Sequence, residues 1–470
     1  MSDRPEMQDP QLSSLLAALG RELGESGVLT GTAVTERQTA DWSGTAAAQP
    51  LAILLPRTPA EVAAALRLCS EYRQPLSIQG GLTGLTGGAN PHEGELVLSL
   101  SRLNRIEEMD PLGGTLVAQA GVTLEALQAF ATEQGWFFPV DLGARGSCQI
   151  GGNAATNAGG NRVLRYGMMR QSILGLEVAL PDGTLLTMLD RVIKNNAGYD
   201  LKQYFIGTEG SLGVITRLAL KLEPQPSASC TVLCALPDFR AAAELLREAR
   251  RQLPDLSAFE LMWDDYFEAC LLALKRQPPF RNAYPLYALV ETLGGDEQAG
   301  QRAIEDFFEQ MMTQGLVCDA VIANSLEQAG QLWDLRDGVS ELLAQMKPCI
   351  AFDVSVAMPH MDDFVAYLRR GLASDFPDQR HLFFGHLGDG NLHLVCGPFP
   401  DEARIEAIEH YVYQAVSDVG GSISAEHGIG MMKKAFLHYS RDPAEIAVMR
   451  RLKQTFDPHG ILNPGRLIPD

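Results

Sequence analysis

The chain has 470 residues, 46% of them hydrophobic and 20% charged, so it is long enough to build more than one hydrophobic core. Its formal net charge of −20 argues against nucleic acid and anionic membrane as partners, because like charges repel. No apolar run approaches the ~20 residues that span a bilayer, and the N-terminus shows no signal-peptide or transit-peptide pattern. We therefore expect a multidomain cytoplasmic protein without a membrane span, whose eight scattered cysteines stay reduced.

The first half of the chain is rich in glycine and combines short apolar runs with a helical pattern. Thr58 precedes Pro59 and is followed three residues later by Glu61, and together they mark the start of a helix. Apolar runs predict strands at 52–56, 76–80, 95–100, 174–180 and 213–222. We expect one domain over residues 1–225, with an N-terminal helix and its main lobes from about residue 50.

Three glycine-rich segments of this domain carry the first chemical signal, at 79–89, 141–167 and 194–216. In QGGLTGLTGGA (79–89), glycines let backbone N–H groups converge and threonines add donors, which suits a pyrophosphate. This segment is neither a Rossmann fingerprint nor a P-loop, because a strand follows it and no Lys-Ser/Thr pair closes it. Alone it could be a hairpin loop, but three such segments favour one extended dinucleotide along the domain.

After a Pro/Ser-rich joint near residue 225, strand patterns alternate with longer amphipathic helices. The predicted strands are 231–237, 287–293 and 320–325, and the predicted helices are 239–252, 303–314 and 326–345. This alternation predicts an α+β domain over 226–430 whose helices cover one face of a sheet. Residues 431–470 return to helix and turn, and we expect them to pack back on the first domain.

The run FGHLGDGNLHLVC (384–396) places two histidines in an apolar stretch. Its Asp-Gly pair predicts a tight hairpin turn, which brings His386 and His393 near each other on one face. Taken alone, two hydrogen-bonded structural histidines are the simpler interpretation. The segment SISAEHGIG (422–430) changes this balance by adding the carboxylate of Glu426, since two imidazoles and one carboxylate are a common ligand set for Zn²⁺ or a similar divalent metal.

His427 directly follows Glu426, and its imidazole could act as a general base. Adjacent residues of a regular strand point to opposite faces, so both side chains reach one site only if the chain turns there. Gly428 and Gly430 predict such a turn.

The segments GGLTGLTGGA, GSCQIGGNAATNAGG and YDLKQYFIGTEGSLGVIT resemble the FAD-binding domain of vanillyl-alcohol oxidase type flavoenzymes, and look most like the branch with D-2-hydroxyglutarate and D-lactate dehydrogenases. The likeness runs from about Leu51 to the C-terminus. It implies an α+β fold class, with a two-lobed FAD-binding domain, a ferredoxin-like α+β substrate domain and a C-terminal helical segment.

The resemblance also implies which residues hold FAD. The pyrophosphate would contact Gly81, Thr83, Gly84, Thr86, Gly87 and Gly88, the flavin would contact Ser147, Gly151, Gly152, Asn157 and Gly160, and Ile215 would lie near the adenine-side strand. Relatives that tether FAD covalently use a His or Cys. No His lies inside the glycine loop, and Cys148 stands where this branch usually has an untethered cysteine, so noncovalent FAD is implied.

In this branch the positions of His386, His393 and Glu426 are metal ligands, and His427 would then be the general base. The expected reaction oxidises a D-2-hydroxy acid to the 2-oxo acid. The metal binds the substrate's carboxylate and hydroxyl, the imidazole takes the hydroxyl proton, and C2 delivers a hydride to the flavin.

The resemblance assigns substrate binding to three residues. Arg336 matches an arginine that binds a substrate carboxylate, and a guanidinium suits that bidentate contact, although an exposed helical arginine is normally just solvated. Ser340 stands four residues later, where the hydroxyglutarate enzymes place a threonine. Asn391 is either a donor at the substrate site or simply a turn residue.

One departure from the branch bears on the substrate. The hydroxyglutarate enzymes carry a lysine two residues before the aspartate of a nearby strand, and here that position is Ala351, with Lys347 as a possible substitute. D-2-Hydroxyglutarate is the favoured substrate, with D-lactate or another D-2-hydroxy acid as the alternative. A zinc hydrolase and a non-redox flavoprotein such as a transferase are the competing classes. The sequence leaves the electron acceptor open, with an electron-transfer flavoprotein and a quinone-type compound as candidates, and it leaves a homodimer open as well.

Overall fold

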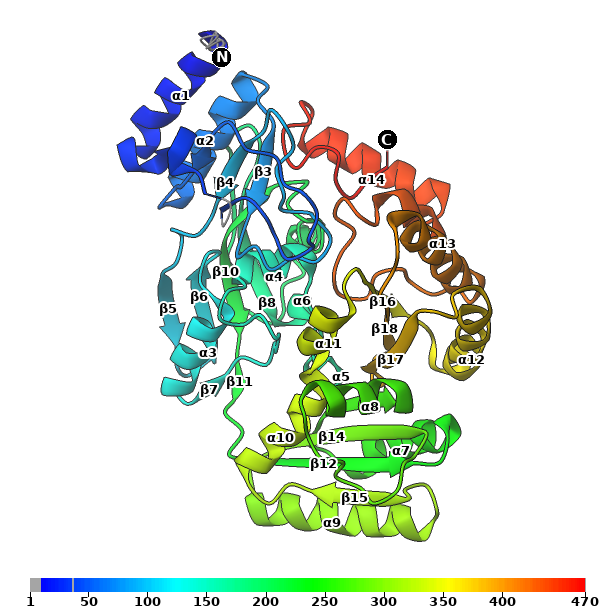
Figure 1. Ribbon diagram of the computed structural model, residues 1–470. Helices are drawn as coiled ribbons and strands as arrows, with labels where there is room; N and C mark the ends of the chain where they lie inside the picture. Colours follow the sequence, from blue (N-terminus) through cyan, green and yellow to red (C-terminus); the bar gives the residue numbers. More distant parts are fainter. Residues whose placement is uncertain (1–9, 36–37, 470) are drawn as a thin grey trace.

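The computed structural model describes residues 10–35 and 38–469 (Figure 1). Residues 1–9, on which the expectation of no signal peptide rests, lie outside the described residues. The first lobe is a small sheet in the order β1-β2-β4-β3, in which β2 and β3 run parallel to β4. Its elements are α1 (Pro10–Leu23), β1 (Val28–Leu29), β2 (Ile53–Leu54), α2 (Pro59–Glu71), β3 (Leu76–Gln79) and β4 (Leu96–Ser99).

The second lobe is an antiparallel five-stranded sheet in the order β5-β6-β10-β8-β9. Its strands are β5 (Ile106–Asp110), β6 (Thr115–Gln119), β8 (Ile173–Ala179), β9 (Leu185–Met188) and β10 (Val214–Lys221). Its helices are α3 (Leu124–Glu133), α4 (Ile150–Thr156), α5 (Val163–Tyr166) and α6 (Met169–Ser172), and β7 (Trp136–Phe137) pairs with β11 (Glu223–Pro224). One apolar core spans both lobes.

The five strands predicted in this half are all present, as is the helix that follows Thr58. The Thr58 hydroxyl accepts the Glu61 N–H at 3.2 Å. The Glu61 carboxylate accepts the N–H of Arg57 at 2.7 Å rather than that of Thr58. The predicted capping residues therefore act at this helix start, with the return contact moved by one residue.

The second half is built on an antiparallel seven-stranded sheet in the order β15-β12-β14-β13-β17-β18-β16. Its strands are β12 (Ala228–Leu236), β13 (Leu256–Trp263), β14 (Leu286–Gly294), β15 (Asp319–Ile322), β16 (Ile350–Ser355), β17 (Arg380–His386) and β18 (Asn391–Gly397). The first four strands, with α7 (Phe239–Gln252) and α9 (Glu297–Thr313), form a β-α-β-β-α-β unit, so this part is ferredoxin-like as expected. Strands β17, β18 and β16 extend its sheet.

Helices lie on both faces of this sheet, so the expectation that they cover only one face is wrong. On β12, Val232 and Cys234 join one core while Leu233 and Ala235 join the other, because the strand is apolar on both sides. The first core contains α7, α9, α12 (Met358–Asp375) and α13 (Glu402–Asp418). The second contains α8 (Asp264–Ala273), α10 (Leu326–Asp337) and α11 (Val339–Met346).

The helix predicted over 326–345 is divided into α10 and α11 at Gly338. A glycine weakens a helix interior and allows the chain to change direction. Gly338 also lies close to its neighbours, since an added Cβ would come within 3.1 Å of the Asp334 carbonyl oxygen.

The two halves meet through α5 and through the C-terminal chain. Directly before α5, Arg162 pairs with Asp141 at 3.1 Å and with Glu291 of β14 at 3.2 Å. After α14 (Pro443–Phe456), Leu462 forms a bridge with Leu76 of β3, so the end of the chain lies against the first lobe. The domain boundaries at about 225 and 430 stay a prediction.

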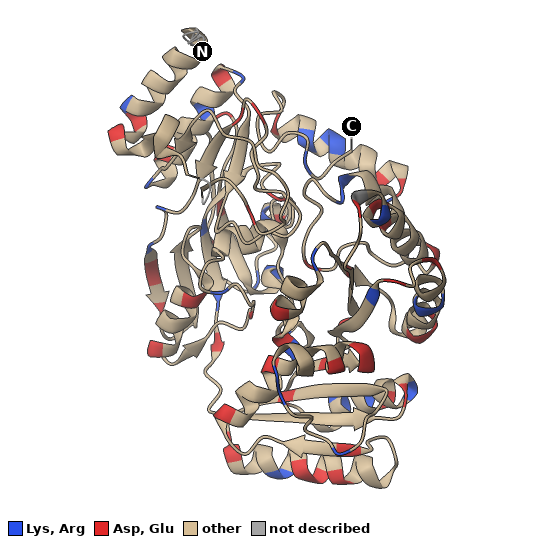
Figure 2. Ribbon diagram, in the orientation of Figure 1, with Lys and Arg blue, Asp and Glu red and all other residues tan. Residues whose placement is uncertain are grey.

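Acidic residues are spread along helices of both halves (Figure 2). All eight cysteines are free thiols. Within residues 10–35 and 38–469, no helix combines the length and apolar character needed to cross a membrane.

Candidate active site

The two histidines lie on one face of the β17–β18 hairpin, as predicted. Residues 387–390 form the turn, His386 pairs with Asn391 across the strands, and Phe384 pairs with His393. Since side chains alternate along a strand, His386 and His393 share a face as diagonal neighbours. Their ring centroids are 5.3 Å apart. Asn391 opens β18, so it is not the turn residue that the sequence allowed.

Glu426 reaches this face from an irregular segment after α13. The chain turns where it was predicted to turn, because Gly428 and Gly430 have φ values of 81° and 54°. The Glu426 Oε1 atom lies 3.8 Å from Nε2 of His386. One ligand atom from each of His386, His393 and Glu426 lies within 4.8 Å of the others. Two imidazoles and one carboxylate at this spacing fit a divalent metal with an open coordination position.

A buried carboxylate missed by the sequence reasoning orients His386. Glu260 of β13 lies opposite His386 and is fully buried, and it contacts Nδ1 of His386 at 2.8 Å. This contact leaves Nε2 facing Glu426, in the way that carboxylates commonly orient metal-binding histidines. Burial disfavours the imidazolium, but Glu260 raises the pKa of His386 to about 9. A metal at Nε2 would therefore compete with a proton.

Arg336 is a buried member of this cluster and not an exposed helical arginine. Its Nε donates to Glu260 at 2.6 Å, and its Nη2 lies 3.2 Å from Nε2 of His386. Its guanidinium lies over the Phe384 ring, 4.9 Å from the centroid. Ser340 is exposed and belongs to α11, beyond the break at Gly338, so the two residues do not share one helix.

A second buried carboxylate, Asp353 of β16, lies opposite His393. Its Oδ2 accepts the backbone N–H groups of Glu426 at 2.9 Å and His427 at 2.8 Å. Nδ1 of His427 lies 3.8 Å from Oδ2, and Nδ1 of His393 lies 3.9 Å from Oδ1. Burial opposes ionisation of Asp353, but His427, Lys433 and His393 hold its pKa well below the usual range.

Asn391 and Ala351 lie on the same face of the sheet as His393. Asn391 is buried, and within the described residues neither atom of its side-chain amide has a hydrogen-bond partner. Ala351 lies two residues before Asp353, opposite Val395, and is exposed, as is Lys347 at the end of α11. Burial lowers the pKa of His393 well below its usual value, although Asp353 opposes this, and the neutral imidazole that burial favours is the form that binds a metal.

The glycine-rich segments come together beside this cluster. A Cβ added at Gly81 would lie 2.0 Å from the Ser147 carbonyl oxygen, and one added at Gly151 would lie 2.9 Å from that of Ala120. Only glycine permits such close approach of two backbones. The N–H of Gly160 donates to Oε1 of Glu426 at 2.9 Å. The segment expected to line the flavin therefore touches the candidate metal cluster.

The glycine loop fits a phosphate group. Within residues 10–35 and 38–469, no backbone N–H from Gly81 to Gly88 donates to a protein acceptor. Consecutive free amides around glycines form an anion-binding concavity. This span includes Thr83, Gly84 and Gly87, and Gly87 has a φ of 73°. The Thr86 carbonyl accepts the N–H of Met431 at 2.9 Å, so the loop also contacts the segment after Glu426.

The other predicted FAD residues differ in how exposed they are to solvent. Ser147 is exposed and Gly152 is half-buried on α4, whereas Ile215 is buried in β10. Asn157 ends α4 in the left-handed conformation, and its Oδ1 accepts the N–H of Arg170 at 3.0 Å. Its side chain therefore anchors α6.

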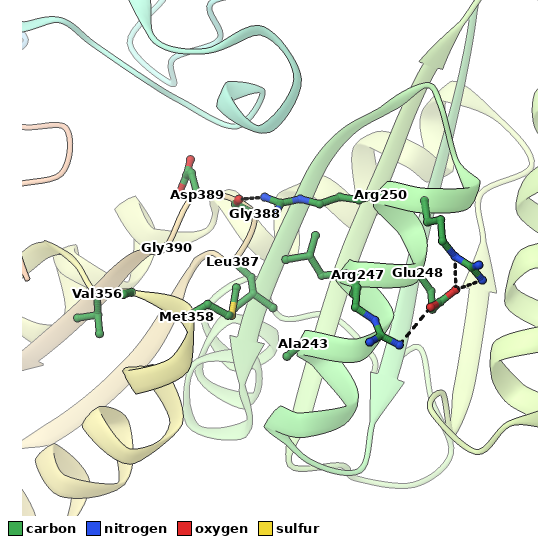
Figure 3. A pocket seen from close by; sticks show the side chains of 13 residues that line it. Ala243, Arg247, Glu248, Arg250, Val356, Met358, Leu387, Gly388, Asp389 and Gly390 are labelled. Atoms are coloured by element: carbon green, nitrogen blue, oxygen red, sulfur yellow. Dashed lines mark hydrogen bonds and ion pairs between the residues drawn. The ribbon is translucent and has the colours of Figure 1, made fainter. Parts of the chain in front are cut away.

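A groove of about 940 Å³ lies behind the hairpin turn, between that turn and α7 (Figure 3). Leu387 and Met358 line it, and Arg250 donates to the Gly388 carbonyl there. It contains none of the clustered histidines or Glu426. We therefore assign the chemistry to the opposite side of the turn, where the ligand atoms converge.

Sequence reasoning missed Glu260 as a functional residue, although its signal was visible. Glu260 stands alone among apolar residues in SAFELMW (257–263), as Asp353 does in CIAFDVSVAM (349–358). A single carboxylate in a strand buried on both faces needs a partner, because an unpaired buried charge is costly.

Comparisons with known proteins agree with this fold and with the FAD-binding loops. The family descriptions "FAD binding domain" and "FAD linked oxidases, C-terminal domain" match residues 50–189 and 225–467. A D-2-hydroxyglutarate dehydrogenase of Xanthomonas citri is 42% identical over 98% of this chain and 97% of its own. The mitochondrial enzyme of that name from Bos taurus is 41% identical over 97% of this chain and 83% of its own.

Two further comparisons concern another relative and a solved structure. A putative mitochondrial D-lactate dehydrogenase of Schizosaccharomyces pombe is 38% identical over 91% of this chain and 84% of its own. The solved structure of p-cresol methylhydroxylase superposes with a TM-score of 0.78 at 17% identity, covering 98% of this chain and 97% of that one, which shows a shared fold. The chain therefore belongs to the FAD-linked oxidases of the vanillyl-alcohol oxidase type, in the branch that includes these D-2-hydroxyglutarate and D-lactate dehydrogenases.

Proposed function

We propose that this FAD-dependent dehydrogenase oxidises a D-2-hydroxy acid to the 2-oxo acid and needs a divalent metal at His386, His393 and Glu426. The observation that carries the proposal is the 2.9 Å hydrogen bond from the Gly160 N–H to the Glu426 carboxylate. It joins a segment that we expect to line the flavin to the proposed metal ligand set, so a redox group and a metal would act on the same small substrate.

Each part of the site has a chemical role. The free amides from Gly81 to Gly88 would hold the pyrophosphate of noncovalent FAD. Once bound, FAD would accept a hydride from C2 of the substrate, and the metal would polarise the 2-hydroxyl. His427 turns Nδ1 toward Asp353 at 3.8 Å, so Nε2 is the atom that would take the hydroxyl proton.

D-2-Hydroxyglutarate is the favoured substrate, and D-lactate is the alternative. Both are supported by the names of the relatives. We assign the distal carboxylate to Arg336 with help from Ser340, and a substrate oxygen to the unpartnered amide of Asn391. A zinc hydrolase would leave the glycine-rich segments unexplained, and a non-redox flavoprotein would leave the metal cluster unexplained.

Several further assignments are predictions about the surroundings of this reaction. The candidate electron acceptors are an electron-transfer flavoprotein and a quinone-type compound, and we propose a homodimer in the cytoplasm. Zn²⁺ is the metal that suits two imidazoles and one carboxylate best.

The decisive experiment is a panel of D- and L-2-hydroxy acids with an artificial electron acceptor, before and after chelation of metal. We expect a yellow protein that oxidises D-isomers, loses turnover on chelation and regains it when Zn²⁺ returns. The matched variants His386→Ala and His393→Ala should lose metal and turnover together. Preference for L-isomers, or full activity of the metal-free protein, would overturn the proposal.

A further inference from the structure

Glu209, in the third glycine-rich segment, has an unusual backbone position. Its φ is 52°, in the left-handed region that residues other than glycine seldom adopt. Its N–H donates to the Ala155 carbonyl at 2.8 Å, and its carbonyl accepts from Nδ2 of Asn463 at 2.6 Å. Anchors on both sides therefore hold a conformation that has an energetic cost.

The Glu209 side chain crosses to the segment that carries Glu426 and His427. Its Oε1 accepts the N–H of Ile429 at 2.7 Å, and its Oε2 accepts the N–H of Gly430 at 2.9 Å. Gly428 must be a glycine here, since an added Cβ would lie 2.7 Å from Oε1. Both carboxylate oxygens are thus committed to backbone donors of one short segment.

Asp353 likewise accepts two backbone N–H groups of this segment, those of Glu426 and His427, which precede the two that Glu209 accepts. Segment 426–430 is therefore held by two carboxylates. Asp353 belongs to the sheet of the second half, and Glu209 belongs to the glycine-rich first half. The first half also contacts this segment through the Gly160 N–H to Glu426 and the Thr86 hydroxyl to the His427 carbonyl at 3.4 Å, and Glu209 adds the two hydrogen bonds that follow His427 in the chain.

We propose that Glu209 is a positioning residue that aligns segment 426–430, and with it the base His427, against the FAD-binding half. This inference rests on the proposed function, since it assigns that alignment to hydroxy-acid oxidation. Glu209 does not contact the ligand atoms of the metal cluster directly. Its loss should therefore change the position of segment 426–430 but not the FAD or metal content of the protein. A displacement of about 1 Å in a catalytic group can cost about 10²-fold in rate.

The test compares Glu209→Gln with a matched control. Glutamine keeps the shape but has one acceptor oxygen, and its amide NH₂ would face a backbone N–H as a second donor. Glu177→Gln is the control, because Glu177 is also a buried carboxylate of the first half, bonded to Thr216 and Arg217. We expect Glu209→Gln to keep FAD and metal at natural occupancy, with KM within a few fold and kcat lower by about 10²-fold.

Hydrogen exchange gives a readout that does not depend on activity. In Glu209→Gln the amides of Ile429 and Gly430 should exchange faster, and the visible circular dichroism of bound flavin should change, whereas Glu177→Gln should show neither effect. Unchanged exchange at both amides, or a kcat equal to that of Glu177→Gln, would overturn the role of Glu209. If the natural protein oxidises no hydroxy acid while the exchange of these amides still changes in Glu209→Gln, the proposed function fails. The role of Glu209 in holding segment 426–430 then stands.

Discussion

Replacing Glu260 with glutamine should destabilise the protein and weaken metal binding at the same time. Glu260 is fully buried and accepts two short contacts, at 2.6 Å from Arg336 and 2.8 Å from His386. Glu260→Gln removes its charge and leaves the buried Arg336 guanidinium with only the half-exposed Asp337 carboxylate, 3.9 Å away, as a counter-ion. Removing one partner of a buried ion pair costs roughly 3–5 kcal/mol, so we expect the free energy of unfolding to fall by about that amount.

The same change should lower metal affinity by about 10- to 100-fold, because the contact that orients a metal-binding histidine is lost. Urea denaturation measures the first effect, and titration of the metal-free protein with Zn²⁺ against a competing chelator measures the second. Glu71→Gln is the matched control for stability. Its pair with Arg67 spans 2.7 Å at a half-exposed site, where a salt bridge contributes about 0–1 kcal/mol.

A double variant separates the buried charge from general disruption. Glu260→Gln combined with Arg336→Gln removes both charges, so the loss of stability should be smaller than the sum of the two single losses. If Glu260→Gln costs no more than Glu71→Gln and leaves the metal affinity unchanged, then this carboxylate neither balances Arg336 nor orients His386, and the reasoning is refuted.

Three further expectations concern the substrate, the base and pH. Ala351→Lys should raise the specificity constants for D-2-hydroxyglutarate and D-malate relative to that for D-lactate by about tenfold to a hundredfold. The reason is that a hydrogen bond to a charged group contributes about 1.5–3 kcal/mol. An unchanged ratio of these constants contradicts the role of Ala351. His427→Ala should keep its metal, measured by elemental analysis, and lose turnover by about 10²–10⁴-fold. Burial lowers the pKa of His381 to about 4, so between pH 6.5 and 4 this histidine binds a proton more readily in the unfolded chain than in the folded protein. The free energy of unfolding should therefore fall as the pH is lowered from 6.5 to 4. His381→Leu should flatten this part of the curve of urea midpoint against pH, and an identical curve would argue against the assignment.

Much of the site was predictable because its signals are local in sequence. A tight turn places His386 and His393 together, and neighbouring glycines make the chain turn beside Glu426. The glycine loops were likewise predictable, since close backbone approach excludes every other residue type at Gly81. These features need no knowledge of distant parts of the chain.

The supporting carboxylates could not be predicted with the same certainty, because their partners are distant in sequence. Glu260 meets His386 across a separation of 126 residues, and only the pairing of β13 with β17 brings them together. Glu209 meets Gly430 across 221 residues and across both halves of the molecule. The burial of Arg336 was missed for the same reason, since a helical pattern alone does not reveal which distant strand covers it.

The strand order of the second half also constrains how the protein matures during synthesis. The face that carries the histidines is assembled from β13, β17, β18 and β16, and Glu426 follows them near the end of the chain. Such long-range pairings form late, because distant segments must first be brought together. The proposed ligand set therefore exists only after Glu426 has been synthesised, and a metal delivered earlier would meet only the two histidines. Loading of the proposed metal would thus follow the assembly of this sheet.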